Sequence, residues 1–289
     1  MKQYLPILSA MVTILMWSSL ASLTVGINHI PASLSVGIVL LIAMLPGIKY
    51  YRNWKLPINV WLTAIIGMFG YHFLLFDAFS RAPAVEVNMI QYLWPLFIVI
   101  GSPLFGGDKL NPGHIIGAIM AFSGVVLVMS SNLEEHNSAY WFGYLEAFAA
   151  ALLWAGYTLS NRKHKNMPSS AIAVVCGISG ILSLCVFGLT YVEVPQISYL
   201  DLLFICLLGL GPMGLSFYTW DYAMRNSDPR FIGSLTYLTP LLSTVMLTIF
   251  YNKSELTFEH LMSLTLIITG SFLGKLFMML QKNHQIKTT

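Results

Sequence analysis

Few side chains in this sequence carry charge, and eight ionisable residues lie inside long apolar runs: His72, Asp77, Arg81, Glu86, Glu146, Asp221, Arg225 and Lys275. Ionisable groups are costly in the hydrocarbon core of a membrane, so they either serve a function or pair near helix ends. Asp77 and Arg81 are four residues apart, as are Asp221 and Arg225, which puts each pair on one face of a helix. The two pairs are therefore candidates for gate latches, one at each membrane face, or for anchors that cap helix ends.

Glu146 and His72 each have a chemical and a structural interpretation. Glu146 could relay a proton, or it could be an interfacial residue that hydrogen-bonds to a neighbour. His72 could bind a substrate or a proton, or it could pack within its helix. The sequence contains no His-Glu-x-x-His, Gly-x-Ser-x-Gly or Walker-type motif, and its three cysteines lack metal-type spacing. We therefore expect no enzymatic activity, no metal and no cofactor.

Aromatic side chains make up 13% of the chain, and one group of them lies deep within the apolar runs. Aromatic walls suit an apolar or aromatic small molecule, and neighbouring amides can supply directed polar contacts. The alternative for each of these residues is packing against lipid or against the protein core. We predict a substrate site formed by Trp17, Tyr71, His72, Asn88, Gln91, Tyr92, Trp94, Trp154, Tyr157, Tyr218 and Tyr237.

Three prolines also fall within apolar runs, at Pro95, Pro212 and Pro240. Proline removes one backbone hydrogen bond from a helix and permits a kink. In a membrane helix such a kink is tolerated where the freed backbone lines a cavity. These positions are therefore predicted helix kinks beside the substrate site.

The elements that must position these residues are membrane helices. Hydrophobic residues make up 56% of the 289 residues and charged residues 9%, whereas soluble domains have about 25% charged residues. This composition excludes an ordinary soluble enzyme, a disordered chain and a nucleic-acid-binding protein. A spanning helix needs about 20 apolar residues, and ten runs qualify, at about 5–26, 34–50, 58–80, 84–105, 113–132, 140–161, 170–191, 199–221, 231–251 and 258–280.

The positive charges support ten crossings. If the N-terminus is cytoplasmic, thirteen of the fifteen Lys and Arg residues lie in cytoplasmic segments, and only Arg81 and Lys253 lie outside. Such an excess on one side is the pattern of cytoplasmic loops. We therefore expect a multi-pass protein of the cell (inner) membrane with both termini in the cytoplasm.

The two halves of the chain repeat the same motifs in the same order. The Asp-x-x-x-Arg motif at Asp77 recurs 144 residues later, and Tyr-Leu-x-Pro at Tyr92 recurs 145 residues later. Trp17 has a counterpart in Trp154, 137 residues later. Five helices in each half is an odd number, so the second half would enter the membrane from the opposite side. The prediction is an all-α fold of two inverted five-helix repeats, residues 1–135 and 136–289, an architecture common among secondary transporters.

These features together resemble the drug/metabolite transporter superfamily, EamA type, over nearly the whole chain. The segment Gln91-Tyr92-Leu93-Trp94-Pro95 is similar to the YddG-like aromatic amino acid exporter branch. The resemblance implies export of small metabolites from the cytoplasm and a central cavity between the two repeats.

We therefore predict a secondary transporter that exports small metabolites, such as aromatic or other apolar amino acids, by alternating access. The alternatives are an intramembrane enzyme and a passive channel. The expected partners are a small-molecule substrate and the lipid bilayer, without nucleic acid. We expect a monomer, although the small residues Gly113 and Gly117 could pack either within the chain or against a second subunit.

Overall fold

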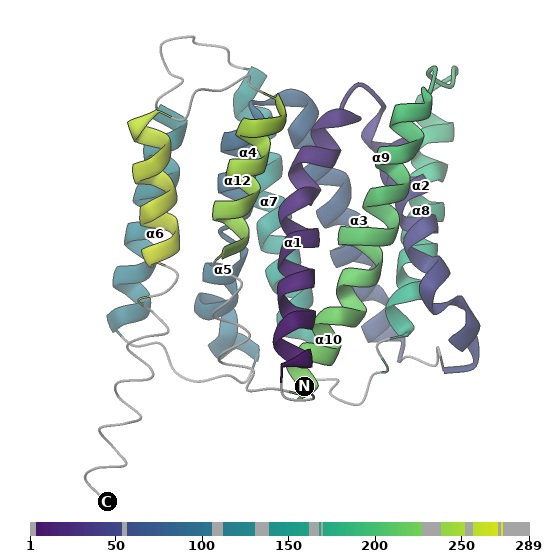
Figure 1. Cartoon of the computed structure of the whole chain (residues 1–289), viewed down its shortest axis with the longest axis horizontal. Helices are drawn as coiled ribbons and strands as arrows, with labels where there is room; N and C mark the ends of the chain where they lie inside the picture. The colour runs from purple at the N-terminus through teal and green to yellow at the C-terminus, as the bar shows by residue number, and fades with distance from the viewer. Residues whose placement is uncertain are drawn as a thin grey trace, which may run out of the picture.

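The computed structural model of the chain describes residues 4–53, 57–105, 112–130, 139–161, 168, 170–226, 238–251, 257–270 and 273. Within these residues the regular secondary structure is helical, and they contain no strand. The helices run side by side as a bundle (Figure 1). The all-helical prediction is thus confirmed for this part of the chain.

The described part of the first half contains six α-helices and two 3₁₀ segments. Proline fits the start of a helix because its missing N–H group is not needed there, and Pro31, Pro57 and Pro83 directly precede three of these helices. The elements are α1 (Leu5–Gly26), α2 (Ala32–Met44), η1 (Leu45–Asn53), α3 (Ile58–Arg81), α4 (Ala84–Gln91), α5 (Trp94–Gly101), η2 (Ser102–Phe105) and α6 (Pro112–Ser130).

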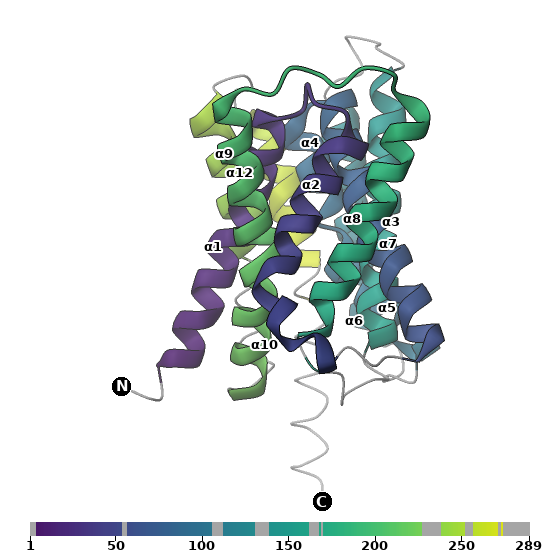
Figure 2. The ribbon, with the colours of Figure 1, turned by 90° about the vertical axis from the view of Figure 1, so that its right-hand side faces the viewer.

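The second half continues the bundle. Its described elements are α7 (Ala139–Asn161), α8 (Ala171–Thr190), α9 (Tyr199–Leu210), η4 (Gly211–Leu215), α10 (Ser216–Asn226), α12 (Leu238–Tyr251) and a last helix, Phe258–Gly270. A capping box begins α9, because the Ser198 hydroxyl accepts from the Asp201 N–H and the Asp201 carboxylate accepts from the Ser198 N–H. Figure 2 shows α2 and α8 side by side at the front, with α9 on the other side of α2.

Within the described residues, five helical stretches are long and apolar enough to cross a membrane: Leu5–Gly26, Ala32–Tyr50, Ile58–Arg81, Ala171–Thr190 and Tyr199–Trp220. Shorter apolar helices lie at Ile115–Gly124, Leu238–Tyr251 and Phe258–Gly270. Each of the ten runs expected from the sequence contains helix in its described part. The chain is consistent with a multi-pass membrane protein.

Three runs expected as single helices are interrupted in the structure. The run 84–105 breaks at Tyr92 and Leu93, between α4 and α5, and the run 199–221 contains the π-helical segment η4. The run 34–50 changes to 3₁₀ geometry at Leu45. In each case a proline stands within three residues of the interruption, and proline cannot donate the backbone hydrogen bond that a continuous α-helix requires.

Glycines allow two helix pairs to pack closely. A Cβ atom on Gly67 in α3 would overlap the side chain of Tyr157 in α7, and one on Gly180 in α8 would lie 2.9 Å from the Gly37 carbonyl oxygen in α2. The absence of these Cβ atoms brings the helix backbones together, as at many membrane helix interfaces. The α3–α7 contact then fixes the positions of the residues on either side of Gly67.

Candidate functional site

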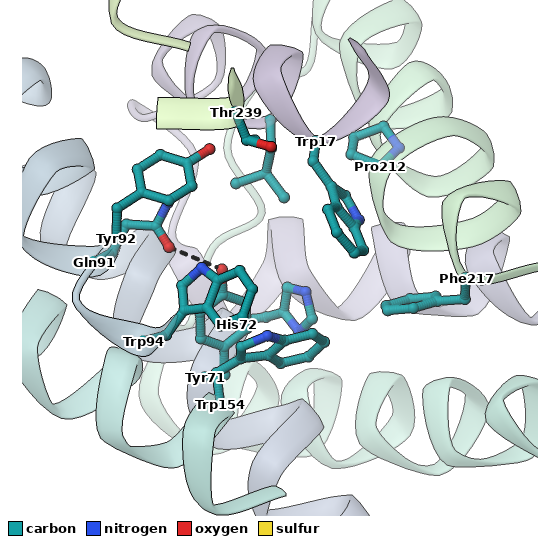
Figure 3. Close-up of a pocket in the computed structure, with 11 residues that line it drawn as sticks. Trp17, Tyr71, His72, Gln91, Tyr92, Trp94, Trp154, Pro212, Phe217 and Thr239 are labelled. Carbon is teal, nitrogen blue, oxygen red and sulfur yellow. Dashed lines mark hydrogen bonds between the residues drawn. The ribbon is translucent and has the colours of Figure 1, made fainter. Parts of the chain in front are cut away.

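A cavity of about 40 Å³ lies near the middle of the bundle. Its wall is formed by side chains from α1, α3, α4, α5, α7, η4, α10 and α12 and from the break after α4, and Figure 3 shows how they surround it. The lining residues are Trp17, Leu20, Tyr71, His72, Gln91, Tyr92, Trp94, Trp154, Pro212, Phe217 and Thr239. Five of the eleven are Trp or Tyr, and His72 is the only ionisable group among them apart from the two tyrosine hydroxyls.

Trp154 of α7 is at the centre of the aromatic part of the wall. Its ring centroid lies 4.8 Å from that of Tyr71, 6.2 Å from that of Phe217 and 6.3 Å from that of His72. Ring pairs at these separations attract one another and also exclude water. α3, α7 and α10 thus meet in one aromatic cluster on one side of the cavity.

Most polar groups of the wall already have partners within the protein. The Tyr71 hydroxyl donates to Oε1 of Gln91 at 3.1 Å, and Nε1 of Trp17 donates to the Ser216 hydroxyl at 3.1 Å. Nδ1 of His72 lies 2.8 Å from the Met68 carbonyl oxygen, which can only accept, so Nδ1 carries a proton. These bonds fix the orientation of the side chains that face the cavity.

The break after α4 places three lining side chains together. Gln91 ends α4, Tyr92 lies in the break and Trp94 begins α5, so their backbones follow no single helical path. Pro95 follows directly and cannot donate the bond that would continue the helix across the break. In a regular helix these neighbouring side chains would point in different directions. Because the helix is broken here, all three can face the cavity.

The remaining predicted substrate residues lie elsewhere. Asn88 is buried between α4 and α12, where its amide contacts the hydroxyls of Ser243 at 3.1 Å and Thr244 at 3.4 Å. Tyr157 packs against Trp154 with ring centroids 5.5 Å apart but does not line the cavity. Tyr218 lies in α10 outside the lining, and Tyr237 lies outside the described residues.

The predicted kinks at prolines differ in their surroundings. Pro212 lies in η4 and lines the cavity. Pro95 follows the break described above, and Pro240 is buried in the first turn of α12.

The first predicted latch brings together three charged side chains near the end of α3. Nε of Arg81 lies 2.6 Å from Oδ2 of Asp77 and 3.5 Å from Oε2 of Glu146, so the guanidinium joins α3 to α7. The guanidinium also stacks over the Phe142 ring at 5.1 Å. Asp221 and Arg225 lie in α10, but their side chains are outside the described part of the structure.

Two polar features were missed by the sequence reasoning. His260 contacts Glu86 across the bundle, with Nε2 and Oε1 3.4 Å apart, and Nδ1 of His260 lies 2.8 Å from the Thr257 hydroxyl. The presence of His260 in an apolar run was the available signal. Thr239 lines the cavity, and its signal was its position in the second Tyr-Leu-x-Pro motif. Among the described residues, no three His, Cys, Asp or Glu side chains gather as metal ligands would.

Comparison with known proteins gives consistent results. The sequence profile of the EamA-like transporter family matches residues 5–130 and 141–274. The aromatic amino acid exporter YddG of Ancylobacter novellus is 35% identical over 82% of this chain and 85% of its own length. A second exporter of that name, from Salmonella typhimurium, is 23% identical over 92% of this chain and 95% of its own. A solved crystal structure with 31% identity superposes with a TM-score of 0.71, covering 94% of this chain and 96% of the other.

Proposed function

The chain belongs to the EamA-like transporter family, and on this basis we propose that it is a secondary transporter that exports aromatic or other apolar amino acids, or related small metabolites. The observation that carries the proposal is the aromatic cavity near the middle of the bundle. Among its lining residues there is no carboxylate, lysine or arginine. A cavity of this kind suits a molecule with an aromatic or apolar side chain and no net charge.

A zwitterionic amino acid has these properties. Its side chain can stack on the cluster around Trp154, where each aromatic pair contributes about 0.5–1.5 kcal/mol beyond the area that it buries. Its ammonium group can lie over an aromatic face, such as that of Trp17 or Trp94, in a cation–π contact. The relatives named as aromatic amino acid exporters support this choice of substrate class.

The proposal requires a second conformation. A cavity of about 40 Å³ holds only one or a few water molecules. An amino acid would need the lining side chains to move apart. Alternating access supplies such a change, because the cavity widens as one face of the bundle opens.

We further propose ten membrane helices arranged as two inverted repeats, residues 1–135 and 136–289. The two stretches matched by the family profile fall one in each proposed repeat. The cavity contacts also support it. Trp17 of α1 bonds to Ser216 of α10, and Trp154 of α7 packs near His72 of α3. Trp154 is the counterpart of Trp17 at an offset of 137, and Ser216 is the counterpart of His72 at an offset of 144.

We also propose an even number of crossings and a monomer, in the cell (inner) membrane. The last described helix runs toward the end of the bundle at which α1 begins (Figure 1). Gly117 packs against Gly270 of that last helix, so this small residue of α6 makes a contact within the chain. We propose that both termini are cytoplasmic, as the distribution of Lys and Arg indicates.

The alternatives have less support. An intramembrane enzyme would need a catalytic motif, which the sequence lacks. A passive channel would need a continuous path, whereas the Trp17 ring of the cavity wall contacts the Trp220 ring, with centroids 5.1 Å apart and the planes tilted by 47°. Since no Walker-type motif is present, an ion or substrate gradient would drive export.

The proposal is tested in proteoliposomes that hold the purified protein. Radiolabelled L-phenylalanine uptake is measured with and without an imposed pH gradient, and protein-free liposomes serve as the control. We expect saturable uptake that other aromatic amino acids inhibit. A linear dependence on concentration would favour a channel, and no uptake or exchange of any aromatic or apolar amino acid would refute the proposal.

A further inference from the structure

Thr239 is a buried polar residue of the cavity wall that the aromatic cluster does not explain. Only 2% of its surface is exposed, and its hydroxyl oxygen has no hydrogen-bond partner among the described residues. Figure 3 shows the Thr239 side chain across the cavity from Trp94, Tyr71 and Trp154. The cavity therefore has an aromatic side and, opposite to it, an unpartnered hydroxyl.

A buried hydroxyl without a partner is destabilising, and nearly all such groups in proteins are hydrogen-bonded. Two hydroxyls close to Thr239 in the bundle do have partners. The Ser18 hydroxyl donates to the Ile14 carbonyl at 2.7 Å, and that of Ser243 donates to Asn88. Among the described residues, the buried hydroxyls of Ser22, Ser179, Tyr218 and Thr239 lack a partner. Of these four residues only Thr239 lines the cavity, where a bound molecule would supply the missing partner.

The internal repeat explains why the two sides of the cavity differ. Thr239 occupies the third position of the second Tyr-Leu-x-Pro motif, and Trp94 occupies the same position of the first. Both side chains line the cavity. One motif thus presents a large aromatic ring and the other a small hydroxyl, so that a substrate with one aromatic end and one polar end has a single favourable orientation.

We infer that the Thr239 hydroxyl donates a hydrogen bond to the carboxylate of the transported amino acid. This inference rests on the proposed function. A hydrogen bond to an ionised acceptor is about twice as strong as one between neutral groups. Thr239 is also in the first turn of α12, the end at which the partial charge of a helix favours anions, as at broken helices in other transporters.

The charge distribution also favours the carboxylate over the ammonium group at Thr239. No lining residue is acidic, so the wall offers the ammonium group no ion pair. Aromatic faces attract cations instead, and the ring of Trp17, which lies between Thr239 and Trp154 in Figure 3, is within the same part of the wall. The amino acid would then bind with its carboxylate at α12 and its ring against Trp154.

The test compares L-phenylalanine with L-phenylalaninamide, which lacks the negative charge. Binding of radiolabelled L-phenylalanine to the purified protein in nanodiscs gives its Kd, and competition gives that of the amide. We expect the parent to bind L-phenylalanine about tenfold more tightly than the amide, as one charge-assisted hydrogen bond provides. If the protein without substitutions binds the two compounds with equal affinity, the inference is overturned before any variant is made.

Three variants then assign the preference to the hydroxyl. Thr239→Val keeps the shape of the side chain and should weaken L-phenylalanine binding about tenfold while changing amide binding less than about threefold. Thr239→Ser should retain the preference. Thr248→Val is the matched control, because its hydroxyl bonds to the Thr244 carbonyl of the same helix at 3.0 Å, away from the cavity.

A preference that persists in Thr239→Val, or an equal loss for both compounds, would overturn the inference and leave the proposed function intact. If Thr239→Val yields no folded protein, Thr239→Cys replaces it, because a thiol is a weak donor. If the parent binds no aromatic amino acid, the proposed function fails and this inference fails with it.

Discussion

At the scale of single residues, Trp154 joins the parts of the candidate site. It contacts rings from α3 and α10 and also Tyr157 on its own helix. Its position depends on Gly67 and Gly70, because Cβ atoms on these glycines would lie against Tyr157 and Leu153. The affinity for an aromatic substrate should therefore be sensitive to the size of this side chain.

We predict that Trp154→Ala weakens L-phenylalanine binding about three- to tenfold, because the substrate loses one aromatic partner worth about 0.5–1.5 kcal/mol. Trp17→Ala and Tyr92→Ala should also lower transport. Trp141→Ala is the control, since Trp141 is 48% exposed on the same helix and lies outside the cavity. Parent-like export by all three cavity variants, at equal amounts of folded protein, would place the substrate elsewhere.

Most of the aromatic residues of the cavity wall could be predicted from the sequence. The sequence could not distinguish polar residues that face the cavity from polar residues that hydrogen-bond elsewhere in the protein. Asn88 and Gln91 are both amides in one short apolar segment. In the structure the Asn88 amide hydrogen-bonds to the hydroxyls of Ser243 and Thr244 in α12, whereas Gln91 lines the cavity. The residues around Asn88 in the sequence do not indicate a hydrogen-bond partner that lies about 155 residues further along the chain. The sequence could not predict that Leu20 lines the cavity, because a leucine in an apolar run can equally face lipid, the protein core or a cavity.

At the scale of elements, the positions at which the helices are interrupted matter for the cavity as much as the helices themselves. Apolar run lengths predicted where the described helices lie, and two of the three prolines predicted as kinks, Pro95 and Pro212, stand at interruptions. Pro240 lies within α12, and the 3₁₀ segment at Pro46 was not predicted. The sequence could not predict the form of each bend. Pro95 accompanies a complete break, Pro212 a π-helical segment and Pro46 a 3₁₀ segment, because packing against neighbouring helices determines how the freed backbone is satisfied.

The α3–α7 interface gives a prediction about stability. Gly67→Ala should lower the thermal unfolding midpoint, because the new Cβ would overlap the side chain of Tyr157 and such overpacking costs about 1–3 kcal/mol. Gly188→Ala in α8 is the matched control, since nothing lies within 4 Å of its new Cβ. We expect the control to be as stable as the parent or slightly more stable. Similar midpoints for both variants would contradict the close contact.

At the scale of the whole molecule, the order of motifs and the distribution of charge determine the proposed topology. The C-terminal ends of α3 and α10 lie at opposite ends of the bundle (Figures 1 and 2). α3 ends where α4 begins, at one end, and α10 lies at the other end. α3 and α10 are the helices that carry the two Asp-x-x-x-Arg motifs. One charged pair near each membrane face is what an inverted repeat requires.

Both termini should therefore lie in the cytoplasm. Fusing a fluorescent reporter that matures only in the cytoplasm to each end, and a phosphatase active only outside it to the same ends, measures this directly. We expect fluorescence and no phosphatase activity at both termini. Phosphatase activity at the Thr289 end would indicate an odd number of crossings and would remove the argument for inverted five-helix repeats.

The last prediction concerns which face opens when a charged pair is broken. Arg81 joins Asp77 to Glu146 and so links α3 to α7 near the proposed outer face. Because the Arg81 side chain is 48% exposed, the pair is worth only about 0–1 kcal/mol, and its loss should shift the equilibrium between conformations by no more than about fivefold. The direction of the shift is therefore more informative than its size.

To measure that direction, Leu20→Cys places one thiol in the cavity wall after the three native cysteines are replaced by alanine. Arg81→Gln should speed its labelling from outside, because the bond holding the outer ends of α3 and α7 is gone. Arg225→Gln, at the corresponding position of α10, should speed labelling from the cytoplasm. The opposite signs follow from the inverted repeat. A shift in the same direction in both variants, or only a loss of folded protein, would identify the pairs as helix-end anchors.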